Sequence, residues 1–153
     1  MWISVAVPSS KRGVEILAPG SKGSQLAPGI VERPSLFSLE PNQLFDGRFQ
    51  EVAPGEVVIY KPRWGSFYQT PLEGHLRGCG VSTVVFCGCN FPNCPRTSIY
   101  EASERDFRVV LAADAVSGLY DRGRDELRNI GVRLMPAAAI IGALAHGTLV
   151  EAT

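Results

Sequence analysis

The sequence predicts an α/β fold, a three-layer sandwich in which helices cover a mostly parallel sheet. From about residue 55 onward, short apolar or β-branched runs alternate with helical stretches. Strands that are apolar throughout are typical of parallel sheets buried on both faces. The chain has 153 residues, 45% of them hydrophobic, which predicts a single domain over residues 1–153.

The predicted strands and helices follow one another in a regular order. Uninterrupted runs of β-branched and apolar residues indicate strands, and apolar residues at helical spacing indicate helices. Glycine and proline mark the ends of several elements. The predicted strands are 2–8, 56–61, 81–88, 107–114 and 131–135, and the predicted helices are 70–80, 95–106, 122–129 and the stretch from Pro136.

Residues 9–54 interrupt this regularity. The segment is rich in glycine, proline and serine. Loops of this length in a compact domain are usually lids or oligomer contacts, or else poorly ordered. We predict an irregular loop or lid here, and the weak periodicity does not decide between a lid or interface and disorder.

Charge and composition argue against several classes of function. Fifteen basic and fifteen acidic residues give a net charge of zero, without a block of like charge, so no nucleic-acid partner is predicted. The longest apolar tract starts at Met135 and is shorter than the ~20 residues of a membrane span. The N-terminus lacks the pattern of a secretory leader. We therefore expect a cytoplasmic protein without a membrane partner.

The cysteines are concentrated in one part of the chain. They are Cys79, Cys87, Cys89 and Cys94. Cys79 and Cys87 are predicted to be structural, because free cysteine often behaves as a small apolar side chain. The spacing of the four cysteines does not match that of paired zinc ligands, and His75 and His146 are isolated. No metal and no cofactor is therefore predicted.

Cys94 differs from the other cysteines because Pro95 follows it. Proline favours the first position of a helix, which predicts that Cys94 is the N-cap residue of the helix over 95–106. A helix N-terminus favours a thiolate, and ligands of open α/β sheets bind beyond the carboxyl ends of strands. Cys94 is therefore a candidate nucleophile. The alternatives are an inert thiol, or a disulfide, redox or metal site that uses Cys89 and Cys94.

Several motifs between residues 55 and 135 occur in a distinctive combination. A strand ends in Lys61, a serine-aromatic-threonine-leucine stretch opens the next helix, Cys94 lies six residues after Gly88, and a later strand ends in Asp114. In this combination the chain resembles the isochorismatase-like cysteine hydrolases, which include nicotinamidases and N-carbamoylsarcosine amidohydrolases. The resemblance implies a Rossmann-like fold and a homo-oligomer.

The resemblance also implies catalytic roles. Cys94 would attack the carbon of a small amide, ureido or carbamoyl substrate and form a thioacyl-enzyme, and Lys61 would stabilise its thiolate. An unusual cis peptide would fall at Cys89–Asn90. The backbone N–H groups of Asn90 and Cys94 would form the oxyanion hole, where fixed donors stabilise the developing negative charge.

Other positions have a structural alternative beside the functional one. Trp64 and Phe67 would line the substrate pocket, and simple packing explains them equally well. Without the resemblance, Lys61 would be interpreted as a solvated lysine at a strand end. Asp114 is expected to have a structural role.

Two family features have no counterpart. The zinc-binding aspartate and histidines of nicotinamidases are missing, so nicotinamide is not the expected substrate. Isochorismate-cleaving members characteristically lack the cysteine, which favours cleavage of a C–N bond.

The second missing feature is a strand. The family's first strand is central in the sheet and ends in the general-base aspartate, whereas residues 2–8 resemble the second strand. Its omission would leave two inner strand edges unpaired.

Three explanations of the missing strand are open. The chain is an N-terminally shortened version of a longer protein, or a non-catalytic relative whose gap a partner fills, or Asp46 replaces the aspartate. The first is the expected one.

The residues and the resemblance together lead to one expected function, a cysteine hydrolase of C–N bonds. The alternative is a non-catalytic or truncated relative that acts as a subunit or binding module.

Overall fold

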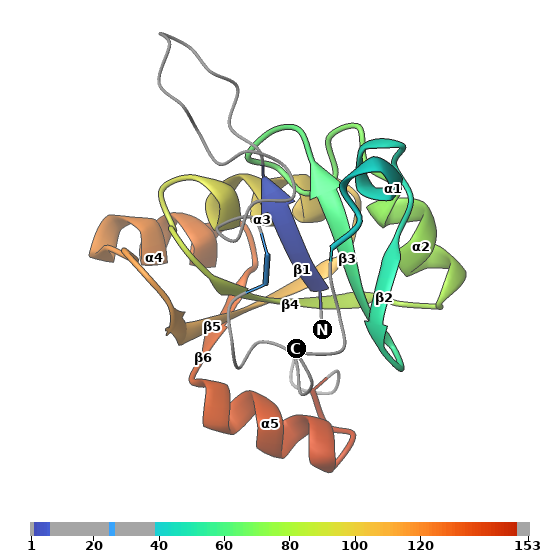
Figure 1. Cartoon of the computed structure of the whole chain (residues 1–153). Helices are drawn as coiled ribbons and strands as arrows, with labels where there is room; N and C mark the ends of the chain where they lie inside the picture. The colour runs from blue at the N-terminus through green and yellow to red at the C-terminus, as the bar shows by residue number, and fades with distance from the viewer. Residues whose placement is uncertain (1, 7–24, 27–38, 150–153) are drawn as a thin grey trace, which may run out of the picture. The chain divides into compact units, whose positions relative to one another are not determined.

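The computed structural model of the chain describes residues 2–6, 25–26 and 39–149 (Figure 1). The chain divides into two compact units, Met1–Gly74 and His75–Thr153, and each is described on its own. The single domain predicted from composition stays a prediction. Within the described part of the chain, no helix is long and apolar enough to cross a membrane.

The first unit contains a mixed sheet of three strands in the order β1-β3-β2. β1 runs parallel to β3 and β2 runs antiparallel to it. Leu39, Leu44 and Val58 form a buried cluster in the described part of its core. Its elements are β1 (Trp2–Ala6), α1 (Pro41–Phe45), β2 (Gln50–Ala53) and β3 (Glu56–Lys61), and α2 (Leu72–Gly78) crosses the boundary to the second unit.

The stretch expected to be an irregular loop or lid is regular near its end. Residues 41–45 form α1 and residues 50–53 form β2. A turn through Pro54 and Gly55 joins β2 to β3, and Gly55 has a φ of +73°, in the left-handed region that glycine adopts without steric cost. Residues 9–24 and 27–38 of the predicted loop lie outside the described residues.

The second unit contains a parallel sheet of three strands in the order β4-β5-β6. Figure 1 shows α3 and α4 on one side of this sheet and α5 on the other. The predicted α/β class is confirmed. The elements of this unit are β4 (Thr83–Gly88), α3 (Cys94–Ser103), β5 (Arg108–Val116), α4 (Asp121–Asn129), β6 (Arg133–Met135) and α5 (Ala137–Ala145).

β4 is an edge strand among the described strands. The carbonyl of Ser82 accepts a hydrogen bond of 2.9 Å from the Arg108 N–H, so alternate residues from Ser82 onward point their backbone groups at β5. The backbone groups of Thr83, Val85 and Cys87 therefore point to the opposite edge, where no described strand pairs with β4. In the first unit, β1 pairs with β3 and with no other described strand. The omission of the family's first strand stays a prediction.

Asp114 connects the sheet of the second unit to α5. Its Oδ1 accepts a hydrogen bond of 2.7 Å from the Ala137 N–H, which is one of the N–H groups that lack an intrahelical partner. The carboxylate therefore caps α5 from outside the helix, because Pro136, the N-cap residue, makes no side-chain cap bond. This agrees with the structural role expected for Asp114.

Replacing Asp114 with alanine is expected to lower the free energy of unfolding by about 1 kcal/mol, the usual cost of losing a helix cap. Urea titration followed by circular dichroism measures the change. Asp125→Ala is the matched control, because Asp125 pairs with the exposed Arg128 and with no other described residue, and its loss should cost less than about 0.5 kcal/mol. Equal effects of the two substitutions would contradict the capping role.

Candidate functional site

Cys94 lies at the start of α3, the helix that follows β4. The N-cap residue is Asn93, whose carbonyl accepts the Thr97 N–H at 3.0 Å, and Pro95 lies in the first turn. Cys94 is thus the first helical residue, and the predicted N-cap position was wrong by one residue, because the helical hydrogen bonds begin at the Asn93 carbonyl. The half-buried thiol still lies at the electropositive end of the helix.

The loop between β4 and α3 has the backbone geometry that the resemblance implies. The peptide bond between Cys89 and Asn90 is cis, so this prediction is confirmed. The Phe91 N–H donates to the Ser117 carbonyl at 2.8 Å, and the Asn93 N–H donates to the Asn90 carbonyl at 3.0 Å. The N–H groups of Asn90 and Cys94, by contrast, donate to no backbone carbonyl of the described residues.

Phe91 holds this loop in place. Its side chain is fully buried and meets the Tyr120 ring edge to face at 5.5 Å between centroids. A Cβ atom at Gly123 would lie 2.6 Å from the Phe91 ring, and one at Gly118 would lie 2.5 Å from Oδ1 of Asn90. Two glycines therefore leave the space that the loop fills.

Arg96 ties the first turn of α3 to α4. Its guanidinium donates to the Tyr120 hydroxyl at 2.7 Å and to Glu126 at 2.7 Å. A hydrogen bond with the Tyr100 side chain, with a contribution from the Glu126 charge, raises the pKa of Arg96 above its ordinary value. The side chain therefore stays charged and connects the two helices by hydrogen bonds.

Lys61 ends β3 in the first unit, and its side chain is only 2% exposed. Its ammonium group donates to the carbonyls of Arg63, at 3.1 Å, and Trp64, at 3.0 Å. The alternative of a solvated lysine is therefore wrong, because the loop after the strand folds over the ammonium. No described carboxylate forms an ion pair with Lys61. A buried charge needs compensation, so this lysine is suited to an anionic partner.

The two aromatic pocket candidates differ in exposure. Phe67 is buried, whereas Trp64 is 60% exposed. Both belong to the first unit with Lys61, and Asn90 and Cys94 belong to the second. The structure thus brings the predicted site residues together in two groups, and a pocket lined by Trp64 and Phe67 stays a prediction.

All four cysteines are free thiols, and a Cys89–Cys94 disulfide is not formed. Cys79 and Cys87 are exposed, which corrects the expectation that they are buried as small apolar side chains. Cys79 follows the end of α2 and lies 3.5 Å from Nε2 of His75. Cys87 lies in β4, which pairs with β5 and with no other described strand.

Two further alternatives find no support in the described residues. No three histidine, cysteine, aspartate or glutamate side chains in that part of the chain gather in a way that could hold a metal ion. Asp46 lies just after α1 on the surface, where its carboxylate pairs with Arg48 at 3.2 Å. A carboxylate in this setting has the environment of an ordinary surface ion pair.

Comparison with known proteins identifies related sequences and structures. A model of the isochorismatase domain matches residues 33–130. Ureidoacrylate amidohydrolase RutB of Methylobacterium radiotolerans is 39% identical over 62 residues, which cover 40% of this chain and 24% of that protein. Maleamate amidohydrolase of Pseudomonas putida is 38% identical over 69 residues, which cover 44% and 32% of the two chains.

The same relationship is seen among solved structures. N-carbamoylsarcosine amidase from Thermoplasma acidophilum is similar with a TM-score of 0.52 and 30% identity, over 55% of this chain and 50% of that one. The chain thus spans half or less of the length of these relatives. The family model, however, matches well over half of the 153 residues. The chain therefore belongs to the isochorismatase family.

Proposed function

We propose that this chain carries the nucleophile of a cysteine hydrolase that cleaves an amide, ureido or carbamoyl C–N bond. The observation that carries the proposal is the position of Cys94 at the N-terminus of α3. Its own N–H and that of Asn90, four residues earlier in the same loop, have no backbone acceptor in the described residues. These groups are suited to stabilise first a thiolate and then an oxyanion.

The proposed reaction has two stages. The Cys94 thiolate attacks the substrate carbon, and the carbonyl oxygen becomes an oxyanion that accepts hydrogen bonds from the N–H groups of Asn90 and Cys94. The C–N bond then breaks, nitrogen leaves with an added proton, and a thioacyl-enzyme remains. Water attacks this intermediate, loses a proton and releases the acid, which regenerates the thiolate.

Lys61 is proposed to stabilise the thiolate. Its ammonium is buried, and two backbone carbonyls orient it without neutralising its charge. An opposite charge within about 4–6 Å favours the ionised form of an acid. The role requires Lys61 and Cys94 to share one site. The reactivity of Cys94 in a variant without the lysine tests this requirement.

The substrate class follows from the names of the relatives. Ureidoacrylate, maleamate and N-carbamoylsarcosine each combine a carboxylate with an amide, ureido or carbamoyl group. We therefore propose small carboxylates with such a group as substrates.

The remaining proposals concern the pocket and the compartment. Trp64 and Phe67 are proposed to line the substrate pocket. A cytoplasmic location is also proposed, and the free cysteines support it, because a reducing compartment keeps thiols free. The homo-oligomer implied by the resemblance stays a prediction.

The proton-transfer group is the missing part of the proposed site. Among the described residues, no carboxylate hydrogen bonds or pairs with Lys61 or Cys94. Formation of a thioacyl-enzyme from an activated ester needs little acid–base help, whereas turnover of an amide needs a group that carries the proton. Acylation and turnover therefore test different parts of the site.

Acylation by p-nitrophenyl acetate tests the nucleophile in this chain. We expect a single acetyl adduct on Cys94, located by peptide mass spectrometry, and no adduct at that site in Cys94→Ser. Cys79→Ser is the control and should acylate like the unchanged chain. Acetylation of Cys79 or Cys87 as fast as Cys94 would contradict the proposal. Ammonia release from maleamate and N-carbamoylsarcosine then separates a complete enzyme from a non-catalytic subunit.

A further inference from the structure

The second unit has a pocket that is separate from the Cys94 loop. Its volume is about 210 Å³. It lies near Thr83, Arg108 and Arg133, at the amino ends of β4, β5 and β6. Cys94 follows the carboxyl end of β4. In a parallel sheet these are opposite ends of the strands, so the pocket does not belong to the proposed site.

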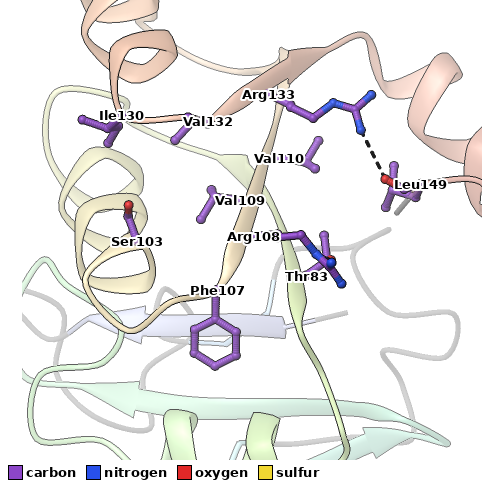
Figure 2. A pocket seen from close by; sticks show the side chains of 11 residues that line it. Thr83, Ser103, Phe107, Arg108, Val109, Val110, Ile130, Val132, Arg133 and Leu149 are labelled. Atoms are coloured by element: carbon purple, nitrogen blue, oxygen red, sulfur yellow. Dashed lines mark hydrogen bonds between the residues drawn. The ribbon is translucent and has the colours of Figure 1, made fainter. Parts of the chain in front are cut away.

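Two arginines extend from one face of the sheet into this region. In the parallel register Thr83 pairs with Arg108, and Val110 pairs with Arg133. Paired residues share a face, as do residues two apart in a strand. The Cα atoms of Arg108 and Arg133 are therefore about 8 Å apart, one strand across and two residues along. Figure 2 shows both side chains on the same side, near Leu149.

The described residues do not neutralise these two charges. Arg133 donates to the Leu149 carbonyl at 3.3 Å, and Arg108 donates to the hydroxyls of Thr83, at 3.1 Å, and Ser82, at 2.7 Å. Neither forms an ion pair with a described carboxylate, and none of the described residues that line the pocket is acidic. Each guanidinium has five N–H donors, so donors remain for an anion.

The rest of the lining is largely apolar. Val110 and Leu149 lie on the same side as the arginines and belong to the core under α5. Val109, Ile130 and Val132 add apolar surface. The volume is below the range of roughly 300–1,000 Å³ of pockets for drug-sized ligands. The lining therefore fits a ligand of few atoms with one anionic and one apolar end.

We propose that this pocket binds a small carboxylate with an apolar body. The guanidinium groups of Arg108 and Arg133 bind the carboxylate, because their planar donors match its two oxygens. The apolar body lies against Val110 and Leu149. The site is independent of Cys94, and it gives this chain a second place for a small acid.

A titration with benzoate tests the site in the unchanged chain. Shifts of backbone amide resonances of the ¹⁵N-labelled protein locate the site and give its Kd, which we expect to be roughly millimolar for so small a pocket. The shifts should concentrate at Thr83, Val110 and Arg133. Benzamide has the same shape without the charge and should not bind, and inorganic phosphate should bind more weakly than benzoate. Equal binding of benzamide or of phosphate would overturn the proposal.

Arginine substitutions test the two charges. Arg108→Gln and Arg133→Gln should each weaken benzoate binding roughly tenfold. The matched control is Arg128→Gln in α4, because Arg128 is exposed and pairs with Asp125, and it should leave the Kd unchanged. Glu151 follows Leu149 by two residues in the sequence and provides a last control. Benzoate binding that appears only in Glu151→Gln would overturn the proposal, since this chain's own carboxylate would then be the occupant.

A final measurement separates this site from the proposed function. Alkylation of Cys94 with iodoacetamide before the titration should leave benzoate binding unchanged. Loss of binding after alkylation would show that benzoate occupies the Cys94 site and would overturn the proposal. Failure of Cys94 to acylate would contradict the proposed function and leave the expected benzoate titration the same.

Discussion

Replacing Lys61 with methionine is expected to slow the alkylation of Cys94 by iodoacetamide at pH 7 roughly tenfold. The Lys61 ammonium is buried and has no carboxylate partner among the described residues. In general, a cation beside a thiol lowers the pKa of the thiol by one unit or more. Each unit changes the fraction present as thiolate at neutral pH about tenfold. Methionine keeps the length and apolar stem of the side chain and removes the charge. Mass spectrometry at graded times measures the rate at Cys94.

A matched control separates the charge of Lys61 from other changes in the loop after β3. Arg63→Met is the matched control, because Arg63 is exposed and only its backbone carbonyl contacts the ammonium of Lys61. Equal rates for Lys61→Met and the unchanged chain would show that the lysine does not act on this thiol.

Most of the second unit was predictable from the sequence because each element has a strong local pattern. The apolar runs before Gly88 and Asp114 gave β4 and β5, and proline at position 95 gave the start of α3 to within one residue. Periodicity and helix capping are local properties. The catalytic candidates followed from their positions at the ends of these elements together with the family resemblance.

Burial and long-range contacts were not predictable in the same way. Nothing near Lys61 in the sequence indicates that the loop after β3 folds its carbonyls onto the ammonium. The helix α1 and strand β2 were missed because they are short and lie in a segment rich in turn-forming residues. The exposure of Cys87 depends on what covers its face of β4, and this is a property of the tertiary structure, which the local pattern does not give.

The supporting role of α4 was also missed, because its sequence is typical of an exposed amphipathic helix. Glu126 pairs with Arg96, and Gly123 leaves room for Phe91. A glycine inside a helix usually costs stability, and this is the one sequence feature that could have indicated close packing at position 123. The loop that contains the proposed oxyanion hole is thus shaped from α4.

Gly123→Ala is expected to lower the free energy of unfolding by roughly 1–3 kcal/mol, the usual range for overpacking a filled core. The new Cβ atom would lie 2.6 Å from the Phe91 ring, which is fully buried. Gly142 in α5 supplies the matched control, because it is also a helical glycine and a Cβ atom there would meet nothing within 4 Å. There alanine should stabilise the protein by up to about 1 kcal/mol. The two substitutions therefore change stability in opposite directions, as urea titration can measure.

The clash also predicts a functional effect and a rescue. A displaced Phe91 ring shifts the backbone next to Asn90, so Gly123→Ala should slow the acylation of Cys94 by p-nitrophenyl acetate, whereas Gly142→Ala should not. Phe91→Leu removes ring atoms near position 123, so its combination with Gly123→Ala should destabilise less than the sum of the single changes. Strict additivity would mean that the ring is not what the new methyl group meets. A rescued fold with restored acylation would show that α4 holds the loop in its reactive shape through Phe91.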